Sequence, residues 1–183
     1  VYYYDLSGKK WIKIGGIVSD STITVEVNYL GQFTVMASGA ITVNLTDISG
    51  HWAEDSIRQL VNRGAVSGYP DGTFKPDNNI TRAEFAVVLL KAYDITPYAG
   101  KVFADTKEHW AKEAISAAAQ YGIVSGYDDN TFQPDEYINR EQMAVMIVNA
   151  AKLIPGESEI NFTDSDNISG WAKAAVATAV EKK

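Results

Sequence analysis

Apolar and polar residues follow two different patterns along the chain, and the change falls near residue 45. Before this point, short runs of β-branched and aromatic residues are separated by Gly, Asp, Asn and Ser, which is typical of strands and turns. After it, apolar residues recur at the spacing of amphipathic helices. The pattern predicts an α+β chain in which a short β segment precedes a mainly helical part.

The β segment is expected to contain five strands. The alternation from Thr22 to Val27 suggests that this strand buries one face. A segment as short as 1–45 rarely forms an independent core, so we interpret it as the last strands of an upstream β-domain, or as strands that pack on the helical part. The predicted strands are Tyr2–Tyr4, Trp11–Ile14, Thr22–Val27, Gln32–Ala37 and Ile41–Leu45.

The helical part repeats itself with an offset of 58 residues and no gap. The matches include Trp, Pro and Gly, so chance does not explain them, and each copy predicts a helix, a loop and a second helix. A third copy begins near Phe162 and covers half a repeat up to Lys183. The matched blocks are His51-Trp52-Ala53 with His109-Trp110-Ala111, Val66-Ser67-Gly68-Tyr69 with Val124-Ser125-Gly126-Tyr127, Thr73-Phe74 with Thr131-Phe132, and Arg82 with Arg140.

These copies predict four segments: 1–45 as the β segment, 46–98 and 99–156 as complete repeats, and 157–183 as a truncated third repeat. The sequence starts at Val1 and shows no charged-then-apolar leader. We therefore expect it to be a piece of a longer protein whose export signal lies upstream.

The loops and second helices carry recognisable local signals. Each loop is expected to turn at a residue that tolerates a positive φ angle, Gly72 in the first copy and Asn130 in the second. The second helix of repeat 1 starts with Thr81 and has Glu84 three residues later, which is a capping box. The second copy has the corresponding Asn and Gln, so the same start is predicted there.

Helix capping does not explain Arg82 and Arg140. Both fall at the first helical position, where the helix dipole disfavours a cation by about 0.3–1 kcal/mol. The positive end of a helix together with an arginine favours the binding of an anion. A structural ion pair and simple exposure to solvent are the alternatives. The candidate ion-pair partners are Asp47, Asp77, Asp105 and Asp135.

Composition and charge exclude several classes of function. The chain has no cysteine, so disulfides, thiolate catalysis and Cys-ligated metals are excluded, and two histidines leave little room for a His-based metal site. The net charge is −7 and no segment is basic, so no nucleic-acid partner is expected. The longest strongly apolar run, Phe85 to Leu90, is far shorter than the about 20 residues that a membrane span needs. No cofactor is implied.

Taken together, the motif order resembles the S-layer homology (SLH) domain. The order is Asp and His-Trp-Ala, then Gly-x-Val-Ser-Gly-Tyr, Gly-Thr-Phe-x-Pro and Thr-Arg-Ala-Glu. The resemblance implies a mainly α-helical, pseudo-threefold unit with grooves between neighbouring repeats. It also implies a non-catalytic module of a secreted cell-wall or S-layer protein of a Gram-positive-type surface. Its partner would be a secondary cell-wall polysaccharide attached to peptidoglycan, bound through a terminal pyruvylated N-acetylmannosamine.

The resemblance also implies which side chains contact this ligand. An alternative for each tryptophan is an anchoring role in the core, and the histidines of the His-Trp-Ala motifs are more simply explained by capping or packing. The implied binding residues are Arg82 and Arg140; Asp47, Asp105 and Asp164; Trp52, Trp110 and Trp171; Gly68 and Gly126.

Three other interpretations stay open at this point. The acidic turns suggest a calcium-binding surface module, although they lack the ligand series of an EF-hand loop. The many carboxylates allow a catalytic pair, but we expect no enzyme because these acids recur with the scaffold. A repeat-built protein-interaction or self-assembly module is the third. The third repeat lacks its turn, its Arg and its second helix, so we expect self-association or partial disorder near residues 155–183.

Overall fold

The structure is a computed structural model, and it describes residues 1–5, 10–14, 17–19, 22–27, 32–34, 44–98, 100–156 and 160–182. The chain forms two compact units, residues 1–41 and 42–183, each of which is described by itself. The first unit contains the strands and the second contains the helices. This confirms the predicted fold class, α+β with a mainly helical part.

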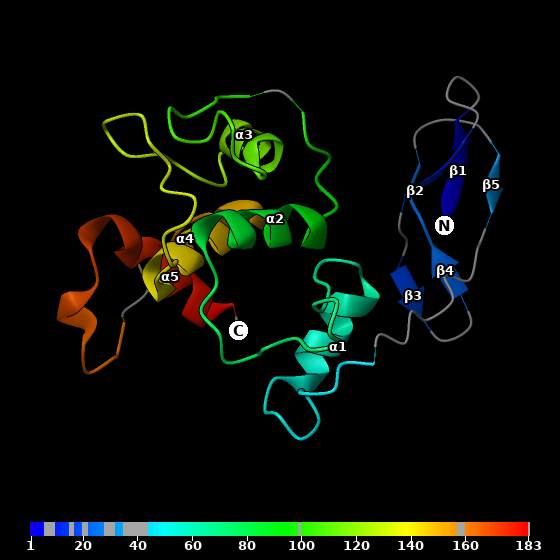
Figure 1. Cartoon of the computed structure of the whole chain (residues 1–183), viewed down its shortest axis with the longest axis horizontal. Helices are drawn as coiled ribbons and strands as arrows, with labels where there is room; N and C mark the ends of the chain where they lie inside the picture. The colour runs from blue at the N-terminus through cyan, green and yellow to red at the C-terminus, as the bar shows by residue number, and fades with distance from the viewer. Residues whose placement is uncertain are drawn as a thin grey trace. The chain divides into compact units, whose positions relative to one another are not determined.

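The first unit is built from two small antiparallel sheets (Figure 1). In one sheet, β1 (Tyr2–Asp5) lies between β2 (Lys10–Lys13) and β5 (Phe33–Thr34). The other sheet is a hairpin of β3 (Ile17–Ser19) and β4 (Thr22–Thr24). Short strands of this kind fit the alternation of β-branched and aromatic residues with turn formers in the sequence.

The predicted strands differ from the observed ones in several places. The sequence pattern missed β3, and the strand that begins at Thr22 ends at Thr24 instead of reaching Val27. Its expected buried face is also wrong, since Ile23 is 40% exposed. In the part of the chain that the structure describes, these two three-residue strands pair with each other alone, and such a hairpin offers too little sheet to cover a side chain. Of the predicted strand Gln32–Ala37, only Phe33–Thr34 is observed as a strand, and residues 35–37 lie outside the described residues. Residues 41–43 of the last predicted strand also lie outside the described residues, and residues 44 and 45 are not in a strand.

The second unit has two helices for each complete repeat, as predicted. The first and third helices follow the His-Trp-Ala motifs, and the second and fourth begin at the capping boxes (Figure 1). Among the described residues, none of these helices is both long and apolar enough to cross a membrane. The helices are α1 (Glu54–Asn62), α2 (Arg82–Ala92), α3 (Lys112–Gln120), α4 (Arg140–Ala150) and α5 (Gly170–Glu181), with a short 3₁₀ turn η1 (Ser165–Asn167) before α5.

The expected helix ends are present. At the start of α2, the N–H of Glu84 donates to the Thr81 hydroxyl at 3.2 Å, and the N–H of Thr81 donates to the Glu84 carboxylate at 2.8 Å. The start of α4 has the same reciprocal arrangement with Asn and Gln. Helices α1 and α3 end two residues before Gly64 and Gly122, whose φ angles are 73° and 70°. Both predicted capping boxes and both glycine stops are confirmed.

The loop after the first helix is nearly the same in both repeats. Gly72 and Asn130 have φ angles of 81° and 62°, which confirms the predicted left-handed turn residues. One residue earlier, the carboxylate of Asp71 accepts hydrogen bonds from the hydroxyl of Thr73 at 2.6 Å and from its N–H at 3.0 Å. Asp129 repeats this arrangement in the second loop. The loops of the two repeats therefore have the same turn conformation although their sequences differ.

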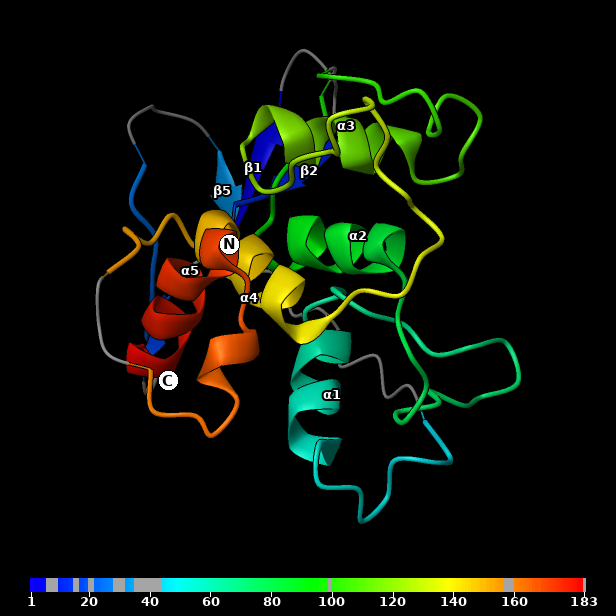
Figure 2. The same cartoon turned by 90° about the vertical axis from the view of Figure 1, so that its left-hand side faces the viewer.

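The second helix of each complete repeat packs against the following repeat. Helix α2 packs against α3 and α4, and α4 packs against α5, which both views show (Figures 1 and 2). The main core lies between these helices and includes the rings of Phe103 and Phe132, both buried, with centroids 5.6 Å apart. A smaller cluster surrounds α1 and consists of Leu45, Ile48, Ile57 and Val61.

Candidate functional site

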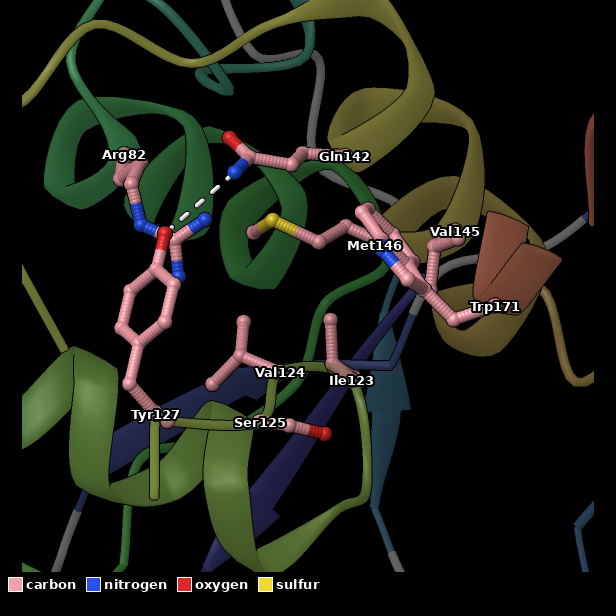
Figure 3. Close-up of a pocket in the computed structure, with 10 residues that line it drawn as sticks. Arg82, Ile123, Val124, Ser125, Tyr127, Gln142, Val145, Met146 and Trp171 are labelled. Atoms are coloured by element: carbon pink, nitrogen blue, oxygen red, sulfur yellow. Dashed lines mark hydrogen bonds between the residues drawn. The ribbon is translucent and has the colours of Figure 1, made fainter. Parts of the chain in front are cut away.

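One cavity in the helical unit is lined by residues from all three predicted repeats. Its volume is about 350 Å³. Arg82 comes from the start of α2, and Trp171 from the first turn of α5. In Figure 3, Arg82 and Tyr127 lie at one end of the cavity and Trp171 at the other. The remaining lining residues are Ile123, Val124, Ser125, Gly126, Gln142, Val145 and Met146.

Arg82 is held in place by the loop of repeat 2. Its Nε donates to the backbone oxygen of Phe132 at 2.9 Å. Its guanidinium carbon lies 4.6 Å from the centroid of the Phe132 ring and 5.2 Å from that of Tyr127. Only 6% of Arg82 is exposed. Among the described residues, none accepts a hydrogen bond from its two terminal guanidinium nitrogens, which are left to donate into the cavity.

The electrostatics of this site favour an anion. Burial lowers the pKa of Arg82, while Tyr127 and Asp105 act in the opposite direction. The group nevertheless stays charged, because the arginine guanidinium is not deprotonated in proteins. A buried cation without a directly bonded counter-ion is costly, and such perturbed groups cluster at functional sites. The site can therefore gain by accepting a carboxylate or another anionic group.

The backbone at the start of α2 does not contribute to this anion site, contrary to expectation. The N–H of Arg82 donates to the Glu136 oxygen at 2.9 Å, and that of Ala83 to the Pro134 oxygen at 3.0 Å. The next N–H is bonded to the hydroxyl of Thr81. The first N–H groups of the helix are thus occupied by repeat 2 and by the cap, and only the arginine side chain is available.

Asp47 and Asp105 each bind backbone N–H groups of the loop of their own repeat. The carboxylate of Asp47 accepts from the N–H groups of Phe74 and Lys75 at 2.8 and 2.7 Å, and Asp105 makes the corresponding bonds in repeat 2. Successive N–H groups of this kind form a concave anion site, here occupied by the protein itself. Burial raises the pKa of Asp47, but the hydrogen bonds from Phe74 and Lys75 outweigh this effect and leave the pKa lowered.

The two other charged residues expected at the site lie elsewhere. Arg140 and Asp164 are exposed and line a different cavity, between the start of α4 and the region around α5. The structure thus separates Arg82 from Arg140, although their sequence motifs are equivalent. A role of Arg140 or Asp164 in ligand binding stays a prediction.

The tryptophans of the three motifs are surface residues. Trp52, Trp110 and Trp171 are 91%, 67% and 60% exposed, so the alternative of core anchors is wrong. They sit just before or at the beginning of their helices. Trp171 lines the cavity of Arg82, whereas Trp110 lines a corresponding cavity of repeat 1 that contains Lys75 and no arginine. Trp52 lines none of these cavities.

Gly126 and Gly68 are required by close packing. A Cβ atom on Gly126 would collide with the ring of Phe103 and with the backbone oxygen of Thr131. A Cβ atom on Gly68 would meet Leu45 in the same way. Gly126 also lines the cavity of Arg82, whereas Gly68 is not among the residues that line the cavity of repeat 1.

The histidines have a structural role, as the simpler interpretation predicted. Nδ1 of His109 accepts the N–H of Ala111 at 3.1 Å, and its Nε2 lies 3.2 Å from a carboxylate oxygen of Asp135. His51 makes the equivalent contacts in repeat 1. These contacts join the start of the first helix to the loop. In the described part of the chain, no three His, Asp or Glu side chains are grouped so that they could hold a metal ion.

Sequence reasoning missed three polar residues that line the cavity, Ser125, Tyr127 and Gln142. Tyr127 lies under the guanidinium of Arg82, and its hydroxyl is 3.4 Å from the side-chain nitrogen of Gln142 (Figure 3). The same Gln142 caps α4, so the cap explained this residue completely in the sequence. The repeated Gly-Tyr pair was a signal for Tyr127, but only its glycine was singled out.

Comparison with known proteins identifies the repeats. The family described as S-layer homology domain matches residues 44–86 and 102–144. These ranges contain the two complete sets of motifs, from the Asp at the start of each repeat to the start of its second helix. They also contain Arg82, Tyr127 and Gln142.

Relatives match over most of this chain. An amylopullulanase of Thermoanaerobacterium thermosulfurigenes is 34% identical over 99% of the chain and 10% of its own length. The S-layer protein EA1 of Bacillus anthracis is 37% identical over 70% of the chain and 15% of its own length. A cellulosome-anchoring protein of Acetivibrio thermocellus is 34% identical over 71% of the chain and 30% of its own length.

The chain therefore spans less than a third of the length of these relatives. Relatives with enzyme names are longer proteins that share this region, and the region itself is an anchoring module and not a catalytic one. The matches point to a secreted, cell-surface protein. Residues 44–86 and 102–144 are S-layer homology domains, and the chain belongs to the S-layer homology family of cell-surface anchoring modules.

Proposed function

We propose that the cavity of Arg82 binds the anionic end group of a secondary cell-wall polysaccharide and so anchors its protein to the wall without a covalent bond. The observation that carries this proposal is the buried Arg82, whose terminal nitrogens have no acceptor among the described residues. The resemblance stated from the sequence supplies the ligand class, a pyruvylated amino sugar attached through the polymer to peptidoglycan.

The chemistry of a pyruvate ketal suits this arginine. Its carboxylate is small, carries one negative charge and matches the fork of two terminal guanidinium nitrogens. A hydrogen bond to a charged group contributes about 1.5–3 kcal/mol. The net charge of −7 repels an anionic polymer only weakly at a distance, since physiological salt screens charges beyond about 8 Å.

The opposite end of the cavity suits the body of the sugar. Trp171 presents an exposed indole, and Val145 and Met146 of α4 lie beside it (Figure 3). An amino sugar has apolar C–H faces as well as hydroxyl groups, and the indole offers a flat apolar surface for such a face. Arg82 would orient the charged end while Trp171 packs against the ring.

A second cavity, in repeat 1, contributes less in this proposal. Among the residues that the structure describes, two lysines, Lys91 and Lys75, and no arginine line it. The Nζ of Lys75 lies 4.3 Å from the centroid of the Tyr69 ring and 3.9 Å from a carboxylate oxygen of Asp71. A lysine is a point charge without the two-pronged geometry of arginine, and this one has a carboxylate beside it. We therefore assign the strong anion contact to the cavity of Arg82 alone.

Because of avidity, one site of moderate affinity per molecule is sufficient for anchoring at a cell surface. Many copies of a surface protein face a polymer with many chain ends, so the second and later contacts form at high effective concentration. The names of the relatives, S-layer protein and cellulosome-anchoring protein, fit such a role.

Co-sedimentation with Gram-positive cell-wall sacculi tests this function. We expect the chain to sediment with untreated sacculi and to stay in solution when the secondary polymer has been removed. Arg82→Ala should abolish sedimentation, while Arg63→Ala, an exposed arginine at the end of α1, serves as the matched control and should bind normally.

Two outcomes contradict the proposal. Binding that survives removal of the polymer would assign the ligand to peptidoglycan. Equal binding of wild type and the Arg82→Ala variant would show that the cavity of Arg82 does not bind the anion. Circular dichroism of each variant confirms that a lost interaction does not come from a lost fold.

A further inference from the structure

The residue that caps α4 also lines the cavity of Arg82. The side-chain oxygen of Gln142 accepts the N–H of Asn139 at 3.3 Å, and the N–H of Gln142 donates to the side-chain oxygen of Asn139 at 2.9 Å. Because the cap uses the oxygen of the amide, its nitrogen is the end that faces Tyr127, whose hydroxyl lies 3.4 Å away (Figure 3). The cap thus places a neutral donor at the end of the cavity where Arg82 lies.

Repeat 1 has a glutamate at the same position. Glu84 precedes Gln142 by the repeat offset of 58 residues and caps α2 in the same way. Its carboxylate accepts the N–H of Thr81 at 2.8 Å, and the residue lines the cavity of repeat 1. Both capping boxes are complete, so capping accepts either side chain. The difference between the two residues is the charge that each brings to its cavity.

Two acids near this end of the cavity are bonded to other groups. Asp105 acts on Arg82 through its charge, but its carboxylate accepts the N–H groups of Phe132 and Gln133 at 2.9 and 2.7 Å. Glu141, beside Gln142 in the chain, accepts the N–H and the hydroxyl of Ser169. Among the described residues that line the cavity, none is acidic. A neutral cap residue therefore leaves the guanidinium without a competing carboxylate.

We propose that Gln142 determines the charge selectivity of the cavity of Arg82, because its neutral amide keeps the guanidinium available for the anionic group of a ligand. This inference rests on the function proposed above and names the residue that makes the cavity prefer a carboxylated sugar to a neutral one. Selectivity of this kind depends as much on the absence of a repelling charge as on the presence of an attracting one.

A glutamate at position 142 would reverse the preference. One carboxylate oxygen would keep the bond to the N–H of Asn139, and the other would take the place of the amide nitrogen beside Tyr127. There it would act as an internal counter-ion of Arg82 and would repel the carboxylate of the ligand. The cavity would then favour a neutral sugar.

The cavity of repeat 1 shows this combination in the natural chain. Its cap residue, Glu84, is acidic, and the cations that line it are Lys75 and Lys91. The Nζ of Lys75 already lies 3.9 Å from a carboxylate oxygen of Asp71. The buried arginine is thus found in the cavity whose cap residue is neutral, and the acidic cap residue in the cavity whose described lining residues include no arginine.

The variant Gln142→Glu tests the inference in the full chain. The two side chains have nearly the same shape, and Glu84 shows that a glutamate completes this cap. Calorimetric titration compares pyruvylated N-acetylmannosamine with the same sugar without the pyruvate. We expect the affinity for the pyruvylated sugar to fall at least about tenfold, since the variant offers Arg82 a competing charged hydrogen bond. The affinity for the neutral sugar should change much less.

Two further variants separate the local charge from other effects. Gln59→Glu makes the same substitution at an exposed position of α1, outside the cavities described above, and should keep the preference for the pyruvylated sugar. Gln142→Ala removes the amide without adding a charge, so it should reduce this preference less than Gln142→Glu does.

The melting temperature distinguishes a change in selectivity from a loss of fold. A carboxylate in the first turn of α4 interacts favourably with the positive end of the helix. Gln142→Glu should therefore melt at the temperature of the wild type or above it while it loses affinity for the pyruvylated sugar. A clear decrease in melting temperature would contradict the expected position of the new carboxylate and overturn the inference.

The wild type separates failure of this inference from failure of the proposed function. A wild-type chain that shows no preference for the pyruvylated sugar would overturn both. A preference that is present in the wild type and persists in Gln142→Glu would overturn the role of Gln142 alone. The same holds if Gln142→Ala or Gln59→Glu loses the preference as fully as Gln142→Glu, because the amide donor or the net charge would then be responsible.

Discussion

Arg82 is the residue on which the binding site depends. It is buried between two aromatic rings and held by one backbone oxygen, so its orientation is fixed before a ligand arrives. Pre-organisation of this kind reduces the entropy lost on binding. The same sequence motif at Arg140 gives an exposed side chain, which shows that the neighbouring repeat and not the motif creates the site.

The acidic residues of the loops make stability depend on pH. Hydrogen bonds from the hydroxyl and the N–H of Thr73 lower the pKa of Asp71, and Thr131 lowers that of Asp129 in the same way. A lowered pKa in the folded state means that the unfolded chain binds more protons in acid. This stabilisation is present above the unfolded pKa of about 3.9 and is lost as the pH falls through the folded value.

We predict that the double variant Asp71→Asn/Asp129→Asn loses part of this acid sensitivity. The amide oxygen of asparagine can still accept from the threonine, so the turn is kept while the titrating group is removed. The measurement is the midpoint of urea unfolding at neutral pH and at about pH 3.5, below the ordinary carboxyl pKa. An equal loss of stability in wild type and variant would contradict this prediction.

A second prediction at this scale concerns Gly126. Gly126→Ala should destabilise the helical unit by about 1–3 kcal/mol, because the new methyl group meets the Phe103 ring and the Thr131 oxygen. Gly170→Ala is the matched control, since a Cβ atom there has nothing within 4 Å and the position is helical. Chemical unfolding of both variants checks the prediction, and equal midpoints would contradict it.

At the scale of elements, local signals in the sequence predicted the helices well. The capping boxes at Thr81 and Asn139 and the glycine stops at Gly64 and Gly122 act within a few residues, so tertiary contacts do not alter them. The strands were predicted less accurately, because a strand is defined by its partner, and β3 is a three-residue segment that only its pairing with β4 reveals.

The same distinction applies to the site. The sequence singled out Arg82, Gly126 and Trp171, and the structure brings these three into one cavity. It could not show that the oxygens of Pro134 and Glu136 occupy the start of α2, since those contacts join residues about 50 positions apart in the sequence. The exposure of the tryptophans also depends on contacts between residues far apart in the sequence. Their spacing along a helix therefore could not predict it.

Helix α5 should depend on Glu141. This carboxylate bonds to the N–H and hydroxyl of Ser169, which is the N-cap of a helix without a side-chain cap of its own. We predict that Glu141→Ala speeds amide hydrogen exchange in α5 and leaves exchange in α2 unchanged, because local opening reports local contacts. Uniform acceleration in both helices, or none in α5, would contradict this role.

At the scale of the whole molecule, the binding residues all belong to one of the two compact units. Arg82, Tyr127 and Trp171 lie within residues 42–183. We predict that a chain of residues 42–183 sediments with cell-wall sacculi as strongly as the full chain. Weaker binding of the shortened chain would show that the β unit takes part in recognition.

The repeat architecture explains why the cavity needs three repeats. Each second helix packs on the next repeat, so residues that are distant in sequence meet between repeats, as α2, the loop before α4, and α5 do here (Figure 2). A repeat protein of this kind buries its core and builds its sites at the junctions.

The most direct test of the binding proposal is calorimetric titration with pyruvylated N-acetylmannosamine, compared with the same sugar without the pyruvate. We predict that the full chain binds the pyruvylated sugar more tightly by about tenfold or more, as expected for a charged hydrogen-bonded pair. This preference should vanish in Arg82→Ala and persist in Arg63→Ala. Equal affinity for the two sugars, or a preference that survives Arg82→Ala, would contradict the assignment of Arg82 as the anion-binding residue.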